Sequence, residues 1–173
     1  MSNIFLISDT HFGHSNILTF LRSDGSPTRS FSSVAEMDET MIDNWNSVVG
    51  KEDKIYHLGD LTFSNKNLDL IMPRLKGTKV LIKGNHDNLK LFQYAKYFKD
   101  VRAYHIMDKL LLSHMPIHVD SLARWKGNVH GHLHTNKLDD SRYLNISVEQ
   151  INYTPIAFEE VRKYFKDLDD INI

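Results

Sequence analysis

An α/β fold with a single domain is the class that the sequence predicts, and three observations support it. The chain has 173 residues, which is the usual size of one domain. Short apolar runs alternate with longer stretches in which apolar residues recur at helical spacing. No internal repeat or low-complexity tract divides the sequence. We therefore expect one domain over residues 1–173, built from layers of strands and helices.

The predicted elements follow one another along the chain. Residues 4–8 are apolar up to Ser8 and predict a buried strand. Residues 33–49 predict a helix, because apolar side chains recur at every third or fourth position and Ser33 with Glu36 forms a capping box. Further strands are expected at 54–58, 79–83, 110–113 and 128–130, and further helices at 88–98 and 158–168.

Composition excludes several classes of protein and of site. Lysine and arginine number 21 against 22 aspartates and glutamates, which gives a net charge of −1 and disfavours binding to long duplex nucleic acid. The absence of cysteine excludes disulfides, thiolate zinc sites and cysteine nucleophiles. The apolar run at residues 4–7 is too short for a signal peptide or a membrane span, so we expect a cytoplasmic protein with no membrane partner.

Polar side chains follow five of the predicted strands, at the point where each strand ends. The segments are Asp9-Thr10-His11, Gly59-Asp60, Gly84-Asn85-His86-Asp87, Ser113-His114 and Gly131-His132-Leu133-His134. Ligands of open α/β sheets bind beyond the carboxyl ends of the strands. These side chains are therefore expected to meet in one crevice, although they come from distant parts of the chain.

The residue types in these segments point to transition-metal chemistry. Aspartate and histidine without cysteine favour Mn²⁺, Fe²⁺, Ni²⁺ or Zn²⁺ over an all-oxygen calcium site, and we expect Mn²⁺ first. The candidate ligands outnumber what one four-coordinate zinc ion needs, and they suit two ions that share a bridging carboxylate. Two such ions can clamp the attacking and leaving oxygens of an in-line displacement at phosphorus.

Taken in order, the five segments resemble the signature blocks of calcineurin-like metallophosphoesterases. The blocks extend from residue 9 to residue 134 and so cover most of the chain. The run from Asp9 to Ile17, and the stretch from Trp45 to Asp60, are also similar to small phosphoesterases of bacteria and their phages. The resemblance implies a four-layer α/β/β/α sandwich, in which two mixed sheets pack face to face with helices outside.

The resemblance also implies a role for each site residue. The first metal ion would be held by Asp9, His11 and His134, the second by Asn85, His114 and His132, and Asp60 would bridge them beside a hydroxide. His86 would protonate the leaving-group oxygen, a task suited to histidine because its charge changes near neutral pH. Asp87 is a candidate to orient His86. Asn85 and His14 are candidate substrate contacts.

The segment after Asp60 departs from the protein phosphatases of this superfamily. Phe63 and Ser64 stand where those enzymes carry an aspartate that orients the catalytic histidine and an arginine that holds phosphate. This departure weakens a protein-phosphatase function. Three other cationic residues are alternatives as phosphate contacts, namely Arg29, Arg124 and Lys126.

The remaining histidines have simpler interpretations. His57 and His130 lie inside predicted strands and are expected to be core residues or to support the site. We expect no special role for His105 or His118. For His14, a substrate contact and an ordinary surface position remain equally open.

These observations predict a dinuclear-metal phosphoester hydrolase, in which the bridging hydroxide attacks phosphorus in line. The expected substrate is a small or nucleotide-like phosphodiester. The alternatives are a phosphomonoesterase, an end-directed nuclease and, more remotely, a binding scaffold without activity. Residues 22–32 and 115–127 are the longest stretches outside the predicted elements, and we expect them to border the crevice and set substrate choice. The sequence leaves the oligomeric state open.

Overall fold

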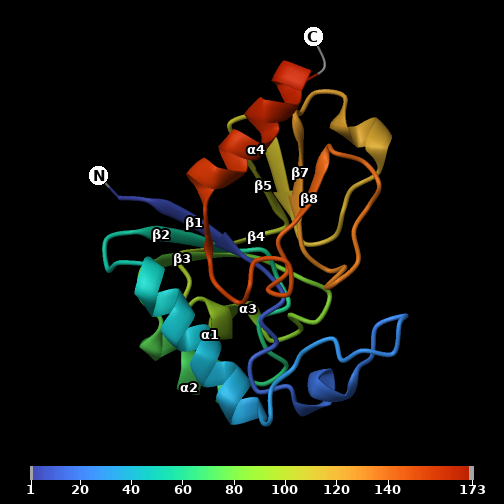
Figure 1. The fold of residues 1–173 in the computed structure, drawn as a ribbon. Coiled ribbons are helices and arrows are strands. Elements are labelled where there is room, and N and C mark those ends of the chain that lie inside the picture. The colour runs from blue at the N-terminus through green and yellow to red at the C-terminus, as the bar shows by residue number, and fades with distance from the viewer. Residues whose placement is uncertain (1, 172–173) are drawn as a thin grey trace.

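A computed structural model describes residues 2–171 and places two mixed sheets together, as predicted (Figure 1). In the first sheet, the strand order is β4-β3-β2-β1-β9. Its strands are β1 (Ile4–Ile7), β2 (Lys54–His57), β3 (Thr78–Ile82), β4 (Asp100–Arg102) and β9 (Ile156–Ala157). The strands β1 to β4 run parallel, whereas β9 is antiparallel to β1.

The second sheet has the order β5-β6-β7-β8. Its strands are β5 (Tyr104–Met107), β6 (Leu110–Ser113), β7 (Gly127–His130) and β8 (Tyr143–Asn145). The strands β6, β7 and β8 run parallel to one another, and β5 is antiparallel to β6. Each sheet therefore combines a parallel centre with one antiparallel edge strand.

Helices flank the sheets, which agrees with the predicted α/β class. The α-helices are α1 (Val34–Val48), α2 (Asn65–Ile71), α3 (Leu91–Tyr94) and α4 (Phe158–Ile171), and the short 3₁₀ helices are η1 (Ser15–Thr19), η2 (Met72–Arg74) and η3 (Val119–Leu122). Figure 1 shows α1, α2 and α3 on one side of the five-stranded sheet and the four-stranded sheet on the other. None of the helices within residues 2–171 has the length and apolar character to cross a membrane.

Two hydrophobic cores follow from the alternation of side chains along β1. Phe5 and Ile7 belong to the core that the five-stranded sheet shares with α1 and α2, where Trp45 is fully buried. Leu6 points the other way and joins the core that contains Leu112 of β6. Successive residues of a strand face opposite sides of its sheet, so one short apolar run supplies both cores.

The helix predicted at 33–49 is confirmed within one residue at each end. The Ser33 side chain accepts a hydrogen bond from the backbone N–H of Glu36, at 3.1 Å. The carboxylate of Glu36 accepts from the backbone N–H and the hydroxyl of Ser32, so the predicted capping box is only half formed. The helix predicted at 158–168 is also present and extends to Ile171.

The helix predicted at 88–98 is wrong, because only Leu91–Tyr94 forms a helical turn. The chain before it turns around the buried carboxylate of Asp87, which accepts the backbone N–H of Gly84 and so holds the loop in a non-helical shape. Helix α2 and strands β4, β5, β8 and β9 were not predicted. These strands have two to four residues each and are mostly half-buried, so they lack the continuous apolar run that marks the equally short but buried strands β1 and β6.

Candidate metal centre

The predicted polar segments meet at the carboxyl ends of the parallel strands. Asp9 and His11 follow β1, Asp60 follows β2, and Asn85 follows β3. From the second sheet, His114 follows β6, while His132 and His134 follow β7. The structure therefore brings together side chains that are far apart in the sequence, and six of them form the two groups of candidate ligands described below.

Backbone hydrogen bonds tie these loops to one another. The N–H of Asp9 donates to the carbonyl of Gly59 at 2.9 Å, and the N–H of His11 donates to the carbonyl of Asp60 at 3.0 Å. Between the sheets, the N–H of His132 donates to Oδ2 of Asp9 at 2.9 Å. The positions of the side chains are thus fixed by a bonded frame of loops.

Left-handed backbone conformations are concentrated in this site. Positive φ angles occur at Asp9 (59°), His11 (49°), Asp60 (56°), His132 (69°) and His134 (49°). Each such conformation costs a residue with a side chain about 1–2 kcal/mol. Such strain persists only where the surrounding structure imposes it, and it gathers at functional sites. Here the positive φ angles turn the side chains of Asp9 and His11, and those of His132 and His134, toward one another.

Two glycines allow the loops to approach closely enough. At Gly59 the φ angle is +97°, and a Cβ atom would lie 2.5 Å from the backbone nitrogen of Gly84. A Cβ at Gly131 would collide with the Asp9 carboxylate and with Ser8. Any larger residue at these positions would separate the segments that carry the site.

One group of candidate ligands consists of Asp9, His11 and His134, whose ligand atoms lie within 4.8 Å of one another. The Oδ1 of Asp9 and both ring nitrogens of His11 are buried without a hydrogen-bond partner among the described residues. Burial raises the pKa of Asp9 and, with the nearby charge of Arg29, lowers the pKa of His11 to about 2. A buried acceptor and a neutral imidazole without partners are costly unless a cation binds them.

A second group consists of Asp60, His114 and His132 within the same limit. The Nε2 of His114 lies 3.3 Å from Oδ2 of Asp60 and 3.0 Å from Oδ1 of Asn85. Burial disfavours the charged form of Asp60, but the hydrogen bond and the charge of His114 outweigh this effect and lower the pKa of Asp60 to about 2. Asn85 therefore stands beside this group, as the sequence predicted.

Asp60 lies between the two groups. Its Oδ2 is 3.6 Å from Nε2 of His11 in the first group and 3.3 Å from Nε2 of His114 in the second. A carboxylate in this position can contact ions on both sides. The residues fit two divalent cations by ligand type, by proximity and by the unpartnered buried atoms of Asp9 and His11.

Glu149 is a support residue that the sequence analysis missed. Its Oε1 accepts from Nδ1 of His134 at 3.0 Å and from Nε of Arg29 at 2.7 Å. Burial opposes ionisation of Glu149, yet the hydrogen bond from His134 and the charge of Arg29 lower its pKa. The signal was present in residues 144–149, where polar and apolar residues alternate after β8.

Arg29 is not available to substrate, which corrects its proposed role as a phosphate contact. The side chain is 1% exposed, and Nη1 and Nη2 donate to the carbonyls of Thr10 and Asp9. Together with the bond to Glu149, these contacts direct the guanidinium at the backbone that precedes His11. Arg29 is therefore a structural residue beneath the first group.

Asp87 also differs from the prediction, because it does not point to His86. Its oxygens accept the backbone N–H groups of Asp60, Leu61 and Gly84 at 2.8, 3.0 and 2.8 Å. Asp87 therefore holds the loop of Asp60 against the loop after β3. The backbone N–H of His86 donates to Oδ1 of Asp60, and the exposed His86 ring brings Nε2 within 4.0 Å of Oδ2 of the same carboxylate.

His57 supports the site from the core, as predicted. Its Nδ1 accepts from the backbone N–H of Gly59 at 3.2 Å, so Nε2 carries the proton and donates to the Thr10 hydroxyl at 3.0 Å. Burial lowers the pKa of His57 to about 3, so the ring stays neutral. His130 is likewise buried, with Nδ1 2.8 Å from the carbonyl of Gly131.

The other histidines divide as the sequence suggested. The ring of His105 stacks on Tyr56 at 4.9 Å, and His118 is an exposed residue before η3. His14 lies next to the metal groups, with its ring 5.8 Å from that of His11. The surface alternative for His14 therefore loses support, although its contact with substrate stays a prediction.

Comparison with known proteins identifies the family of this chain. Residues 2–171 match the family described as calcineurin-like phosphoesterase. The chain belongs to this family. Its members are metal-dependent phosphoester hydrolases that typically bind two divalent ions, so the chain is a metal-dependent phosphoesterase.

Individual relatives cover nearly the whole phosphoesterase chain. The uncharacterised protein MJ1445 of Methanocaldococcus jannaschii is 36% identical over 94% of this chain and 91% of its own length. The gene 66 protein of Mycobacterium phage D29 is 24% identical over 98% of this chain and 99% of its own. The crystal structure of a protein of unknown function, AQ665 from Aquifex aeolicus, is similar with a TM-score of 0.73 and 28% identity, over 94% and 99% of the two chains.

Two hollows border the site of the phosphoesterase. One, of about 430 Å³, lies between the turn at residues 20–23 and the loop that carries His132 and His134; we call it the hairpin cavity. The other, of about 340 Å³, is lined by Lys83, Asn85, His114 and Met115, among others. Parts of the segments 22–32 and 115–127 thus border the crevice, as predicted.

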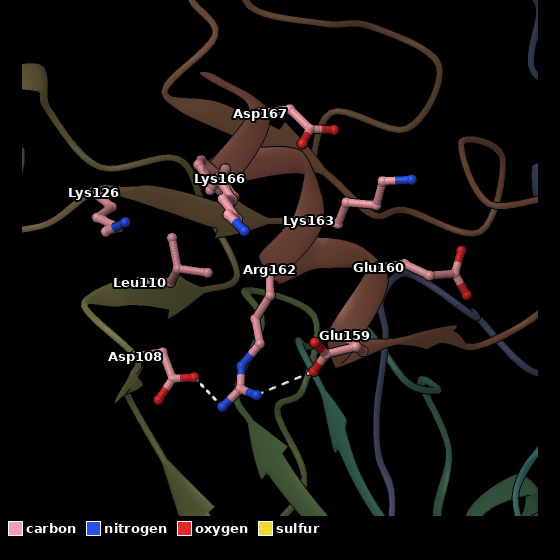
Figure 2. A pocket seen from close by; sticks show the side chains of 10 residues that line it. Asp108, Leu110, Lys126, Glu159, Glu160, Arg162, Lys163, Lys166 and Asp167 are labelled. Atoms are coloured by element: carbon pink, nitrogen blue, oxygen red, sulfur yellow. Dashed lines mark hydrogen bonds and ion pairs between the residues drawn. The ribbon is translucent and has the colours of Figure 1, made fainter. Parts of the chain in front are cut away.

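A larger hollow of about 700 Å³ lies elsewhere, beside α4 (Figure 2). This α4 cavity is lined by residues that include Asp108, Lys126, Glu159, Glu160, Arg162 and Lys163. Lys126 immediately precedes β7, so it stands at the end of the sheet opposite to His132. This placement corrects the suggestion that Lys126 contacts phosphate. Arg124 is exposed in the same segment, and its contact with phosphate stays a prediction.

Proposed function

We propose that this phosphoesterase is a phosphodiesterase that acts on a small or nucleotide-like substrate with two divalent ions, Mn²⁺ foremost. The observation that carries the proposal is the pair of ligand groups that share Asp60, with unpartnered buried atoms in the first group. Asp9, His11 and His134 would hold one ion, and Asn85, His114 and His132 the other. When bound, the ions would generate hydroxide from water at neutral pH and offset charge on the phosphoryl oxygens.

Fixed hydrogen bonds prepare the histidines for this role. The Nδ1 of His134 donates to Glu149, and the Nδ1 of His114 donates to the carbonyl of Leu58 at 2.8 Å. These partners set which ring nitrogen carries a proton and leave each Nε2 directed toward the carboxylates. The chain thereby orients its ligands before any ion or substrate arrives.

His86 would act as the proton donor to the leaving group. Its ring is about half exposed and borders Asp60, so it can reach both the crevice and solvent. Asp87 is next to His86 in the chain, but its carboxylate is buried against backbone N–H groups. It therefore has no role in this transfer. His86 would therefore work without the orienting aspartate of the protein phosphatases.

The charges at the site favour a diester over a monoester. A diester carries one negative charge at neutral pH, whereas a monoester carries nearly two. The guanidinium that lies closest to the first group, Arg29, is committed to protein acceptors. With Phe63 exposed where protein phosphatases carry their aspartate, the site offers an apolar contact and few cations, which suits a monoanionic substrate with an organic group on each side.

The test compares two esters with the same leaving group, bis-p-nitrophenyl phosphate and p-nitrophenyl phosphate. The protein is stripped with a chelator, dialysed and assayed with Mn²⁺, Fe²⁺, Ni²⁺ or Zn²⁺. We expect a higher kcat/KM for the diester, a higher rate with Mn²⁺ than with the other ions, and a loss of about 10²–10⁴-fold in His86→Ala. His118→Ala is the matched control, because this exposed histidine lies before η3.

Each outcome has a consequence. Faster turnover of the monoester would make the protein a phosphatase. Turnover that is equal in His86→Ala and wild type would remove the proton-donor role. Shortening of a labelled single-stranded oligonucleotide from one end, at a higher kcat/KM than the small diester, would identify an end-directed nuclease instead. No turnover with any ion, despite bound metal, would refute the enzymatic function.

A further inference from the structure

A row of aromatic rings leads away from the metal groups. The ring of Phe63 stacks on His11 at 5.4 Å and contacts His86 at 4.9 Å. It also lies 4.5 Å from the ring of His14, which in turn lies 6.0 Å from Phe20. Phe63 is 42% exposed and Phe20 is 50% exposed, so large apolar surfaces face solvent directly beside a polar site.

This row ends at the hairpin cavity. The turn that carries Phe20 and Leu21 is a narrow hairpin. It is closed by hydrogen bonds from the N–H of Arg22 to the carbonyl of Ser26 and from the N–H of Thr28 to the carbonyl of Phe20, and by the pairing of Leu21 with Pro27. Ile17, Phe20, Leu21 and Leu133 supply apolar lining, and Arg22 adds a cation. A hollow of about 430 Å³ falls in the range of small-ligand sites, which are mainly apolar with a few polar groups.

The position of the cavity tells which part of a substrate it can take. His132 and His134 line it, so a phosphoryl group between the ligand groups would have one substituent directed there. His86, the proposed proton donor, is not among the lining residues and lies at the other end of the aromatic row, against Phe63. In an in-line displacement the leaving group departs toward the proton donor. The cavity is therefore left for the other substituent.

We propose that the hairpin cavity, with Phe20 and the neighbouring ring of His14, forms a subsite for a planar aromatic group on the non-leaving side of the phosphodiester, such as a nucleobase. Exposed aromatic rings of this kind stack on planar groups, and their exposure is otherwise unfavourable. The inference rests on the proposed phosphodiesterase function and adds the chemical class that the site selects.

The test holds the leaving group constant and changes the other substituent. Bis-p-nitrophenyl phosphate has an aromatic second group, whereas methyl p-nitrophenyl phosphate has a methyl group. The measured quantity is the ratio of kcat/KM for the aromatic ester to kcat/KM for the methyl ester, with Mn²⁺. We expect this ratio to fall by about 3- to 10-fold in Phe20→Ala, the range of one aromatic contact.

Two further variants control for the loss of a ring. Phe20→Tyr keeps the ring and should keep the ratio. Phe92→Ala removes an exposed phenylalanine of α3, for which the described residues show no contact with a ring of the site, and it should also keep the ratio. The free energy of unfolding of all variants is measured, and it should stay near wild type because Phe20 and Phe92 are exposed.

The outcomes separate this inference from the function on which it rests. A ratio unchanged in Phe20→Ala, with both esters hydrolysed, overturns the subsite and leaves the phosphodiesterase intact. An equal loss for both esters places the leaving group at the row and also overturns it. No hydrolysis of either ester by the wild-type protein with bound metal refutes the proposed function, and the subsite with it.

Discussion

The metal-site loops and the α4 cavity are both rich in charged side chains, but they differ in how those charges are paired. In the α4 cavity, Arg162 binds the carboxylates of Asp108 and Glu159 at the surface (Figure 2). At the metal-site loops, buried atoms of Asp9 and His11 have no partner among the described residues. In the larger hollow, Arg162 is thus paired with two carboxylates, while the smaller hollows border buried groups that need a cation.

This difference teaches that unpaired buried polar atoms, rather than the size of a hollow, mark the functional site. Leaving such atoms unpaired costs free energy, and so does a left-handed backbone. Both costs fall on the metal-site loops, whereas at the α4 cavity Asp108 carries the left-handed backbone alone. A protein that has unpaired polar atoms and a left-handed backbone in one place is stabilised by a ligand that binds there and pairs with those atoms. The following predictions compare matched variants of the two regions.

The largest effect is expected for Asp60→Asn. Loss of the shared carboxylate removes one negative charge from both ligand groups, so we expect activity to fall by at least about 10²–10³-fold and bound metal to drop below that of wild type. Metal content by mass spectrometry and the diester assay measure this. Asp108→Asn, the matched change in the α4 cavity, should leave both values unchanged; equal losses in the two variants would contradict the comparison.

A smaller effect is expected for Glu149→Gln. The variant weakens the support of His134 and leaves the buried Arg29 without its ionic partner. Metal affinity, measured by competition with a chelator, should fall about 10- to 100-fold. Glu160→Gln changes a carboxylate at the α4 cavity and serves as control. If both variants bind metal as wild type does, Glu149 has no positioning role.

Asp38 of α1 lies outside both regions, and its buried carboxyl predicts how the free energy of unfolding depends on pH. Burial raises the pKa of Asp38 from 3.8 to about 6, although the N–H of Gly13 opposes this. The folded protein therefore holds the proton more tightly than the unfolded chain, and the stability that this group contributes is lost as pH rises between about 4 and 6. In metal-free protein, urea unfolding should show Asp38→Asn gaining stability relative to wild type over that interval. A constant difference would contradict the raised pKa.

The smallest effect is expected for Arg162→Ala. Its ion pairs are exposed, and exposed pairs contribute little to the free energy of unfolding. Activity, metal content and urea unfolding should all stay close to wild type. A loss of activity would show that the α4 cavity takes part in function, and it would break the comparison.

Much of the site could be predicted because its residues follow strands with a clear apolar pattern. The runs at 4–7, 54–58 and 79–82 identified where Asp9, Asp60 and Asn85 would emerge. Parallel strands end at one edge, so their proximity followed from the fold class. Polar and apolar residues also alternate over residues 144–149, but this local pattern does not show that Glu149 reaches His134 and Arg29.

The amino-acid sequence by itself determined five strands, β1, β2, β3, β6 and β7, the polar residues that end them and the ligand chemistry that aspartate and histidine supply. Tertiary structure alone decided which of these residues face a common point and which support them. Arg29 reaches Glu149 across 120 residues of sequence, and Asp87 binds the backbone of a loop that precedes it by 26 or 27 residues. Local patterns cannot specify such pairs, because their energy depends on burial and on distance in space rather than on spacing in the chain.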